Sequence, residues 1–166
     1  MQNHPRRRLL AVAATAAMSP ASPSVRDRFL GVWKLVAYER RRANGAVDHP
    51  YSQKPVGRIT YDSAGRMSAQ LMRPGRRCSL PAGVSFATGT ANDAEVREAV
   101  GGFVAYFGTF DVDESSHTVI HHVEACLVPS WVGHDLKRSY RFEGNRLLLS
   151  AVAADFTVNL TWQRDQ

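Results

Sequence analysis

The segment from Gly102 to Gly133 constrains the fold most, because its side chains alternate in character with the period of a β-strand. The residues of its first limb divide between two faces. One face carries Val104, Tyr106, Gly108 and Phe110, and the other carries Phe103, Ala105, Phe107 and Thr109. A strand that lies between a core and an outer layer requires this period of two. The segment therefore predicts two strands joined by a turn.

The second limb of the same segment contains the best candidate for chemistry. Alternation places Val119, His121 and Val123 on one face and Ile120, His122, Glu124 and Cys126 on the other. If the second face lines a cavity, the Glu124 carboxylate can hold the His122 imidazole in one tautomer and raise its basicity, which makes His122 a general acid or base near neutral pH. If that face is the outer one, the pair is solvated and His121 points inward. Alternation alone leaves both arrangements open.

Six further segments alternate in the same way, which gives eight strands in total. They are 31–40, 56–61, 66–72, 136–143, 147–153 and a last strand that begins near Phe156. Gly65 ends the turn between the second and third of the eight strands, where it can take the positive φ that a tight turn needs. The segment from Thr90 to Gly101 is predicted to form the single helix, with Asn92 or Thr90 as its N-cap. Residues 73–89 are rich in proline and glycine, which predicts an irregular crossing.

Eight short antiparallel strands with tight turns close naturally into a meander barrel. The interior of such a barrel is filled by side chains or holds one small ligand. The sequence therefore predicts an all-β fold, an eight-stranded antiparallel barrel with one short helix. An open sandwich is the alternative.

The length of 166 residues, 44% of them hydrophobic, suits one domain with a proper core, predicted over 25–166. Residues 1–24 are predicted to be a flexible or signal-like leader, because three arginines (Arg6 to Arg8) precede an Ala-rich apolar run and a Ser/Pro-rich stretch. A signal would place the protein in the periplasm or outside the cell, and otherwise it is cytoplasmic. Met18 is an alternative start. The apolar run is shorter than the roughly 20 residues that span a bilayer, so no membrane span is predicted.

Charge and cysteine content exclude several classes of function. The formal charge is +6, but Arg6 to Arg8 supply three of the 21 positive charges, and the clusters Arg40 to Arg42 and Arg73 to Arg77 flank turn-like sequence. We therefore predict no nucleic-acid partner. Cys78 and Cys126 match no zinc or redox spacing, which favours two free thiols over a disulfide. No metal ligand set, cofactor motif, phosphate-binding loop or GxSxG nucleophile motif is predicted.

Several short stretches, taken in this order and spacing, carry a family resemblance. They are GVWKLV at 31–36, GRITYD at 57–62 with GRMS at 65–68, AYFGTF at 105–110, and HHVE at 121–124 followed by PSWVG at 129–133. From Arg28 to Trp162 the chain resembles bacterial lipocalin-like domain proteins of the calycin barrel group. The resemblance implies a barrel that encloses a small, mostly apolar molecule. Some relatives are suspected of cyclase or isomerase roles, and the second and third signature regions of classical secreted lipocalins are missing here.

These observations predict that the chain binds a small hydrophobic or aromatic molecule in the barrel lumen, with Trp33 packed at the closed end. The expected ligand-binding residues are Tyr61, Gln70, Tyr106, His122 and Glu124, with Trp131 at the mouth. The alternative is an enzyme of the cyclase or isomerase type, acting on a polyketide-like or terpenoid substrate, with His122 and Glu124 as catalytic residues. A filled barrel that acts through its surface is a third possibility. The sequence leaves open whether the chain is an enzyme and whether it forms a homodimer.

Overall fold

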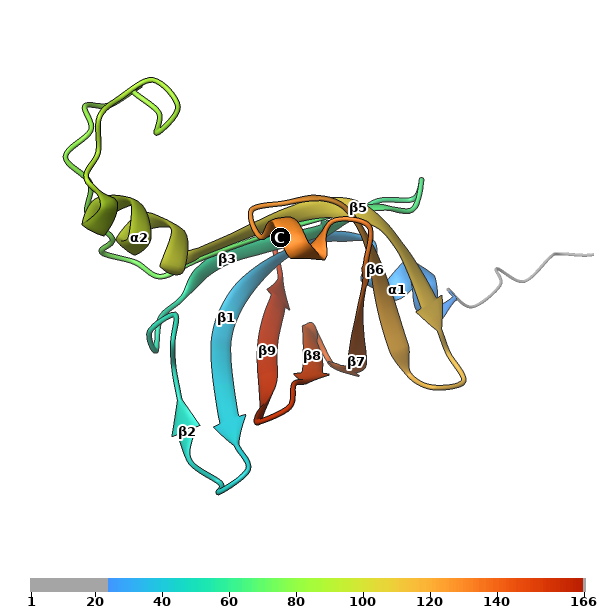
Figure 1. Ribbon diagram of the computed structural model, residues 1–166. Helices are drawn as coiled ribbons and strands as arrows, with labels where there is room; N and C mark the ends of the chain where they lie inside the picture. Colours follow the sequence, from blue (N-terminus) through green and yellow to red (C-terminus); the bar gives the residue numbers. More distant parts are fainter. Residues whose placement is uncertain (1–23, 166) are drawn as a thin grey trace, which may run out of the picture.

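In the computed structural model, which describes residues 24–165, eight antiparallel strands pair in sequence order and close on themselves (Figure 1). Pairing between the first and last strands closes the barrel, from Trp33 opposite Arg164 to Arg42 opposite Phe156. The strands of the barrel are β1 (Gly31–Arg42), β3 (Val56–Tyr61), β4 (Arg66–Met72), β5 (Phe103–Asp113), β6 (Thr118–Cys126), β7 (Asp135–Glu143), β8 (Arg146–Val152) and β9 (Phe156–Arg164). The two-residue strand β2 (Val47–Asp48) pairs with the end of β1. The predicted eight-stranded barrel is confirmed, and the open sandwich is wrong.

Three short helices accompany the strands: α1 (Val25–Phe29), α2 (Asp93–Gly101) and the 3-10 helix η1 (Pro129–Trp131). α2 is the helix that the sequence predicts. Its cap is Asn92, whose side chain accepts from the backbone N–H of Glu95 while the Glu95 carboxylate accepts from the N–H of Asn92. Ser24 and Asp27 form the same kind of reciprocal cap on α1. This cap stabilises the start of α1, a helix that was not predicted from the sequence.

α1 closes one end of the barrel by placing the Phe29 side chain among the inward-facing aromatic rings. Phe29 is fully buried, and its backbone carbonyl accepts a 2.7 Å hydrogen bond from the indole N–H of Trp33. The Arg164 guanidinium donates to the carbonyls of Arg28 and Leu30, both at 2.6 Å, and lies over the Trp33 ring. The predicted packing role of Trp33 at the closed end is confirmed.

The faces predicted for β5 are confirmed, and β6 contains an irregularity that the sequence does not reveal. Tyr106 and Phe110 are buried on the inner face of β5, whereas Phe107 is 53% exposed. The register between β5 and β6 shifts between Phe107 and Gly108, which leaves Glu124 as an extra residue of β6. After this β-bulge, the side chains of β6 that point inward are shifted by one residue. Cys126 therefore lies opposite Tyr106 and packs against the core. The expectation that Cys126 shares the face of His122 is therefore wrong.

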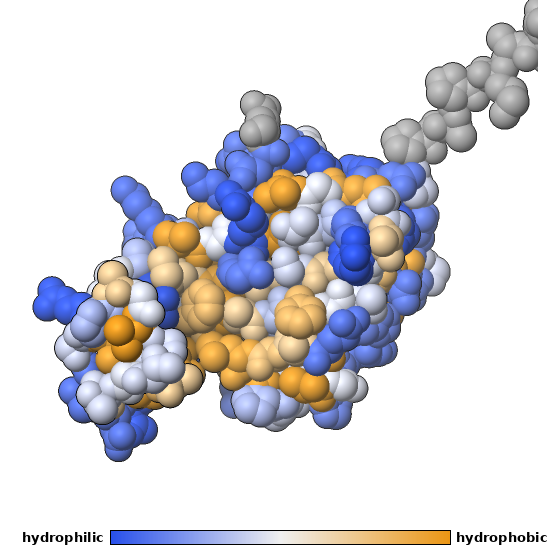
Figure 2. Space-filling model, turned by 90° about the horizontal axis from the view of Figure 1, so that it is seen from above, coloured by the Kyte–Doolittle hydropathy of each residue, from blue (hydrophilic) through white to orange (hydrophobic). Residues whose placement is uncertain are grey.

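The connections at the two ends of the barrel differ. The turns 62–65, 114–117 and 144–145 surround the closed end near α1. The long connections 43–55, 73–102 and 127–134 surround the open end, together with the short turn 153–155. α2 belongs to the longest of these connections and projects from the barrel on the side away from α1 (Figure 1). Figure 2 shows apolar side chains gathered on the outer surface between α2 and the barrel. Homodimer formation stays a prediction.

Two further predictions from the sequence concern the pairing of the cysteines and the presence of a membrane-spanning helix. Both cysteines are free: Cys78 is exposed and Cys126 is half-buried. Within residues 24–165, none of the helices has the length and apolar character needed to cross a membrane. The predicted signal-like leader lies outside the described residues and stays a prediction.

Candidate functional site

A cavity of about 340 Å³ occupies the open half of the barrel. Its walls are apolar side chains from six strands, and aromatic rings surround its rim. The wall residues include Ile59, Leu71, Val104, Leu149, Leu160 and Trp162, and the rim residues include Tyr38, Tyr51, Trp131 and Phe156. No aspartate or glutamate lines the cavity. The barrel is thus hollow, and the filled-barrel alternative is wrong for this half of it.

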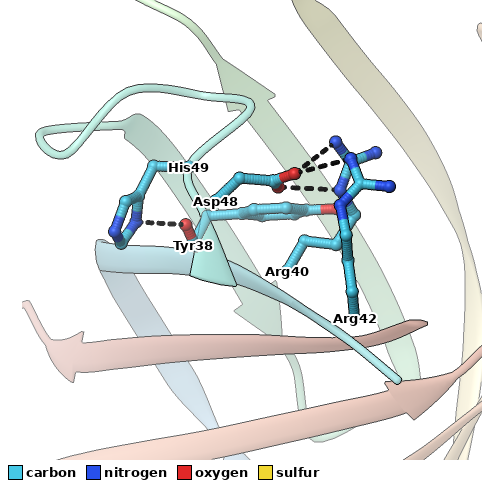
Figure 3. Close-up of polar contacts among 5 residues, drawn as sticks. All are labelled: Tyr38, Arg40, Arg42, Asp48 and His49. Atoms are coloured by element: carbon cyan, nitrogen blue, oxygen red, sulfur yellow. Dashed lines mark hydrogen bonds and ion pairs between the residues drawn. The ribbon is translucent and has the colours of Figure 1, made fainter. Parts of the chain in front are cut away.

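The hairpin of β1 and β2 holds the aromatic rim in place (Figure 3). The Asp48 carboxylate accepts two hydrogen bonds of 2.8 Å from Arg40 and one of 2.9 Å from Arg42. The hydrogen bonds from Arg40 are the main reason that the pKa of Asp48 falls to about 2. His49 donates from Nδ1 to the backbone carbonyl of Tyr38. These contacts hold Asp48 and His49 against β1, at Tyr38 and just after it. The ring centroid of Tyr38 lies 4.7 Å from that of Tyr51.

A hydrogen-bonded group of three side chains forms the polar floor of the cavity. His121 is fully buried, and its two ring nitrogens bond to two phenols: Nε2 to Tyr61 at 2.8 Å and Nδ1 to Tyr106 at 2.9 Å. The imidazole is neutral here, because burial, aided by the nearby Arg138 charge, lowers the pKa of His121 to about 3. A neutral imidazole donates through one nitrogen and accepts through the other.

The surroundings of Tyr61 decide which nitrogen of His121 carries the proton. Tyr61 is 1% exposed and does not line the cavity, and among the described residues its hydroxyl bonds only to His121. A buried O–H needs an acceptor, so Tyr61 donates to Nε2. Nδ1 then carries the proton and donates to the oxygen of Tyr106. The O–H of Tyr106, which lines the cavity, is therefore left free to donate into the lumen.

Arg138 adds a positive charge to this wall. It lies on β7 between Leu136 and Tyr140 in the inward phase, is half-buried, and lines the cavity. Its Nη1 donates to the Lys137 carbonyl at 3.0 Å, and no carboxylate among residues 24–165 pairs with it. The polar part of the cavity therefore offers hydrogen-bond donors and a permanent cation.

The structure brings together only some of the residues that the sequence suggests. Tyr61 and Tyr106 meet at His121, and Trp131 lies at the open end with its ring 6.2 Å from that of Tyr106. Gln70 is on the outer face of β4, since Ala69 and Leu71 on either side of it point inward. Its expected place in the lumen is wrong.

His122 and Glu124 also lie outside the barrel, so the expectation that they line the lumen is wrong. The buried residues of β6 are Val119, His121 and Val123, which leaves Glu124 exposed and His122 on the outer surface. There His122 bridges two carboxylates, with Nδ1 2.6 Å from Asp135 and Nε2 3.0 Å from Asp111. The partner of His122 is thus across the strands rather than along its own strand.

Arg138 and the rim residues Tyr38 and Tyr51 were not predicted from the sequence. A signal for Arg138 was present, because it alternates in phase with Leu136, Tyr140 and Phe142, all apolar or aromatic. Tyr51 lies in a loop rich in proline, where no period exists to predict its direction.

The two neighbouring histidines are expected to titrate in opposite ways. The hydrogen bonds to Asp135 and Asp111 raise the pKa of His122 above its ordinary 6.5, whereas His121 stays neutral through this range. Stabilisation from protonated His122 is therefore present at low pH and lost as the pH rises through its raised pKa, and at this exposed site it amounts to less than about 1 kcal/mol. An NMR titration of the imidazole Cε1–H signals checks this. The H122N variant identifies which of the signals that shift with pH belongs to His122. Titration of His121 between about pH 5 and 8 would contradict the buried network.

Within residues 24–165, no group of three or more histidine, cysteine, aspartate or glutamate side chains is arranged to hold a metal ion.

Comparisons with known proteins bear on the cavity. A family model described as a lipocalin-like domain matches residues 30–164. Over 92 residues the chain is 38% identical to a 4'-hydroxy-3'-methoxypropiophenone carrier protein of Aspergillus oryzae, an alignment that covers 52% of this chain and 79% of that relative. No solved structure matches the chain.

Proposed function

The chain belongs to the lipocalin-like domain family, and from this premise we propose that it is a carrier that binds a small aromatic molecule in its lumen. The observation that supports this most directly is the cavity of about 340 Å³ with an apolar wall and an aromatic rim. Its volume is within the range of roughly 300 to 1,000 Å³ that is usual for small-molecule sites. The few polar groups at its floor, set in an apolar wall, are typical of a site that fixes the orientation of a ligand.

The similar carrier protein suggests the chemical type of the ligand. Its name describes an aromatic ketone that also bears a hydroxyl and a methoxy group. A flat aromatic ring suits the wall of this cavity, because the rings of Tyr106 and Trp131 meet at 77° and offer both a face and an edge for contact. The ligand oxygens would find donors at the floor. We therefore propose an oxygen-bearing aromatic ketone or a close analogue as the ligand.

Calorimetric titration with 4'-hydroxy-3'-methoxypropiophenone tests this function. We expect saturable binding of one molecule per chain. A151W should weaken it at least about 10-fold, because Ala151 lines the cavity and a tryptophan there takes up ligand volume. A105W is the matched control, since Ala105 lies on the outer face of β5 and does not line the cavity. Equal loss in both variants, or no binding by the wild-type chain, would contradict the proposal.

The proposed alternative of a cyclase or isomerase depended on His122 as an acid or base inside the lumen. With His122 on the outer surface, the imidazole in the lumen is that of His121, whose pKa of about 3 keeps it uncharged near neutral pH. A neutral imidazole whose two nitrogens are both occupied by phenols is poorly suited to move a proton to or from a ligand. The carrier function is therefore the one that the geometry supports best.

A further inference from the structure

We infer that Arg138 and Tyr106 form an oxyanion subsite in the lumen, so that the ligand is an acidic aromatic molecule that presents a phenolate or carboxylate oxygen to them. This inference rests on the proposed carrier function and adds the chemical class of the ligand. Both side chains line the same cavity, Tyr106 from β5 and Arg138 from β7. The strand β6, with His121, lies between them.

The first argument concerns the charge of Arg138. A guanidinium is charged at every physiological pH, and a charge removed from water is costly unless an anion compensates it. The cavity wall supplies no compensating charge, because its lining residues include no aspartate or glutamate. The ionisable groups that face the cavity beside Arg138 are Tyr38, Tyr51, Tyr106 and His121. All four are neutral near pH 7, since burial raises the pKa of Tyr38 and Tyr106 to about 12 and that of Tyr51 above its ordinary value, and lowers that of His121. A ligand that fills the cavity would take this half-buried charge further out of water, and an anionic group on the ligand would then compensate it.

The second argument concerns the direction of the hydrogen bonds at the floor. The chain of donors runs from the Tyr61 hydroxyl to His121 Nε2, and from His121 Nδ1 to the Tyr106 oxygen. It ends in the O–H of Tyr106, which has no acceptor among residues 24–165 and is free to donate to a ligand oxygen. An oxygen held by this O–H and by the guanidinium receives donors from two strands. Hydrogen bonds to a charged oxygen are also about twice as strong as those between neutral groups.

The third argument concerns the balance between the polar floor and the rest of the cavity. Apart from Arg138, His121, the tyrosine hydroxyls and the indole N–H groups of Trp131 and Trp162, the lining is apolar. An acidic group on an aromatic ring matches this division, because one edge of the molecule is charged and the remainder is flat and apolar. In a hydroxyaryl ketone with the acyl group para to the hydroxyl, the carbonyl delocalises the phenolate charge, so such a phenol ionises more readily than a simple one.

Three aromatic ligands that differ in whether and where they carry a negative charge test the subsite at a pH where the phenol is ionised. They are 4'-hydroxy-3'-methoxypropiophenone, its methyl ether 3',4'-dimethoxypropiophenone, which cannot ionise, and 3,4-dimethoxybenzoate, which carries a carboxylate instead. We expect the wild-type chain to bind the phenolate or the carboxylate at least about 10-fold more tightly than the methyl ether. The anion with the lower Kd identifies which oxyanion the site is built for.

The variants R138M and R138K assign this preference to the guanidinium. R138M should lose the 10-fold preference for the anion over the methyl ether, whereas R138K should keep part of it. R141M is the matched control, because Arg141 lies on the same strand but is exposed and pairs with Glu143. Circular dichroism confirms that each variant is folded, and R138K serves if R138M is not.

The outcomes separate this inference from the proposed function. Equal Kd values of the wild type for all three ligands, unchanged in R138M, would overturn the subsite and leave the carrier function standing. Failure of the wild type to bind any of the three would contradict the carrier function itself. A preference for the anion that R138M retains and R141M loses would place the anion outside the lumen and also overturn the subsite.

Discussion

Replacing Gly108 with alanine is expected to destabilise the protein by more than about 3 kcal/mol, the upper end of the usual cost of overpacking. A Cβ at this position would overlap the backbone carbonyl oxygen of His122 and lie 3.0 Å from the backbone nitrogen of Glu124. Both atoms belong to the bulged part of β6, which is hydrogen-bonded on each side and cannot move as a flexible side chain can. The bulge therefore depends on the missing side chain of Gly108.

Urea unfolding followed by circular dichroism measures this effect, with the change in the midpoint read at an unchanged slope. G101A is the matched control: Gly101 is at the end of α2, where a Cβ meets no atom within 4 Å. That variant should be neutral or stabilised by up to about 1 kcal/mol, because alanine loses less backbone entropy than glycine. A cost below about 1 kcal/mol for G108A would show that the bulge can relax around a methyl group.

Replacing Phe29 with alanine is expected to destabilise the protein by about 3 to 5 kcal/mol, as is usual for a fully buried phenylalanine. The Phe29 side chain is fully buried and fills the closed end of the barrel. Its ring centroid lies 4.9 Å from that of Phe142, 5.0 Å from that of Tyr140 and 5.4 Å from that of Tyr61. Truncation would leave a cavity among rings that are held by their own strands and cannot collapse into it. The loss should therefore include both the transfer energy and the cavity term.

The exposed Phe86, on the irregular connection before α2, provides the control for this second prediction. Its side chain is 47% exposed, and F86A should change the free energy of unfolding by no more than about 0.5 kcal/mol. Equal midpoints for F29A and F86A in urea unfolding would mean that α1 is not part of the cooperative core.

The hairpin of β3 and β4 could be predicted to the residue, because its sequence contains its own boundaries. The turn Asp62 to Gly65 has a glycine at φ 84°, and the strands on either side alternate strictly from Val56 to Met72. The faces of β5 were likewise fixed by alternation. In each case the signal is local, so no knowledge of the partner strands was needed.

The inward histidine could not be predicted, because the outcome depends on which face of β6 meets the core. His121 and His122 are adjacent, and exchanging their faces changes no local propensity. The bulge at Glu124 adds a second uncertainty, since one extra residue reverses the phase of everything that follows it in the strand. Asp135 and Asp111, the partners of His122, lie on other strands and are visible only once the register is known.

Arg138 shows a different limit of reasoning from a strand pattern. An arginine among LKRSYRFE is ordinarily assigned to solvent, although its phase here is that of the inward residues. What makes an inward arginine tolerable is the open cavity in front of it, and a cavity is a property of the closed barrel. Alternation thus places Arg138 on the inward face, but the residue type alone argues against that placement.

Both ends of the described chain leave the barrel beside α1, at the end opposite the cavity. The backbone N–H of Asp165 donates to the carbonyl of Val32, and Arg164 donates to the carbonyls of Arg28 and Leu30. The end of β9 therefore lies against α1 and the start of β1. A fluorophore, a surface linker or a second protein joined at residue 24 or at residue 165 would therefore leave the aromatic rim unobstructed. If the protein were immobilised through either position, the cavity mouth would face the solution, which is a favourable orientation for detecting small molecules that enter it.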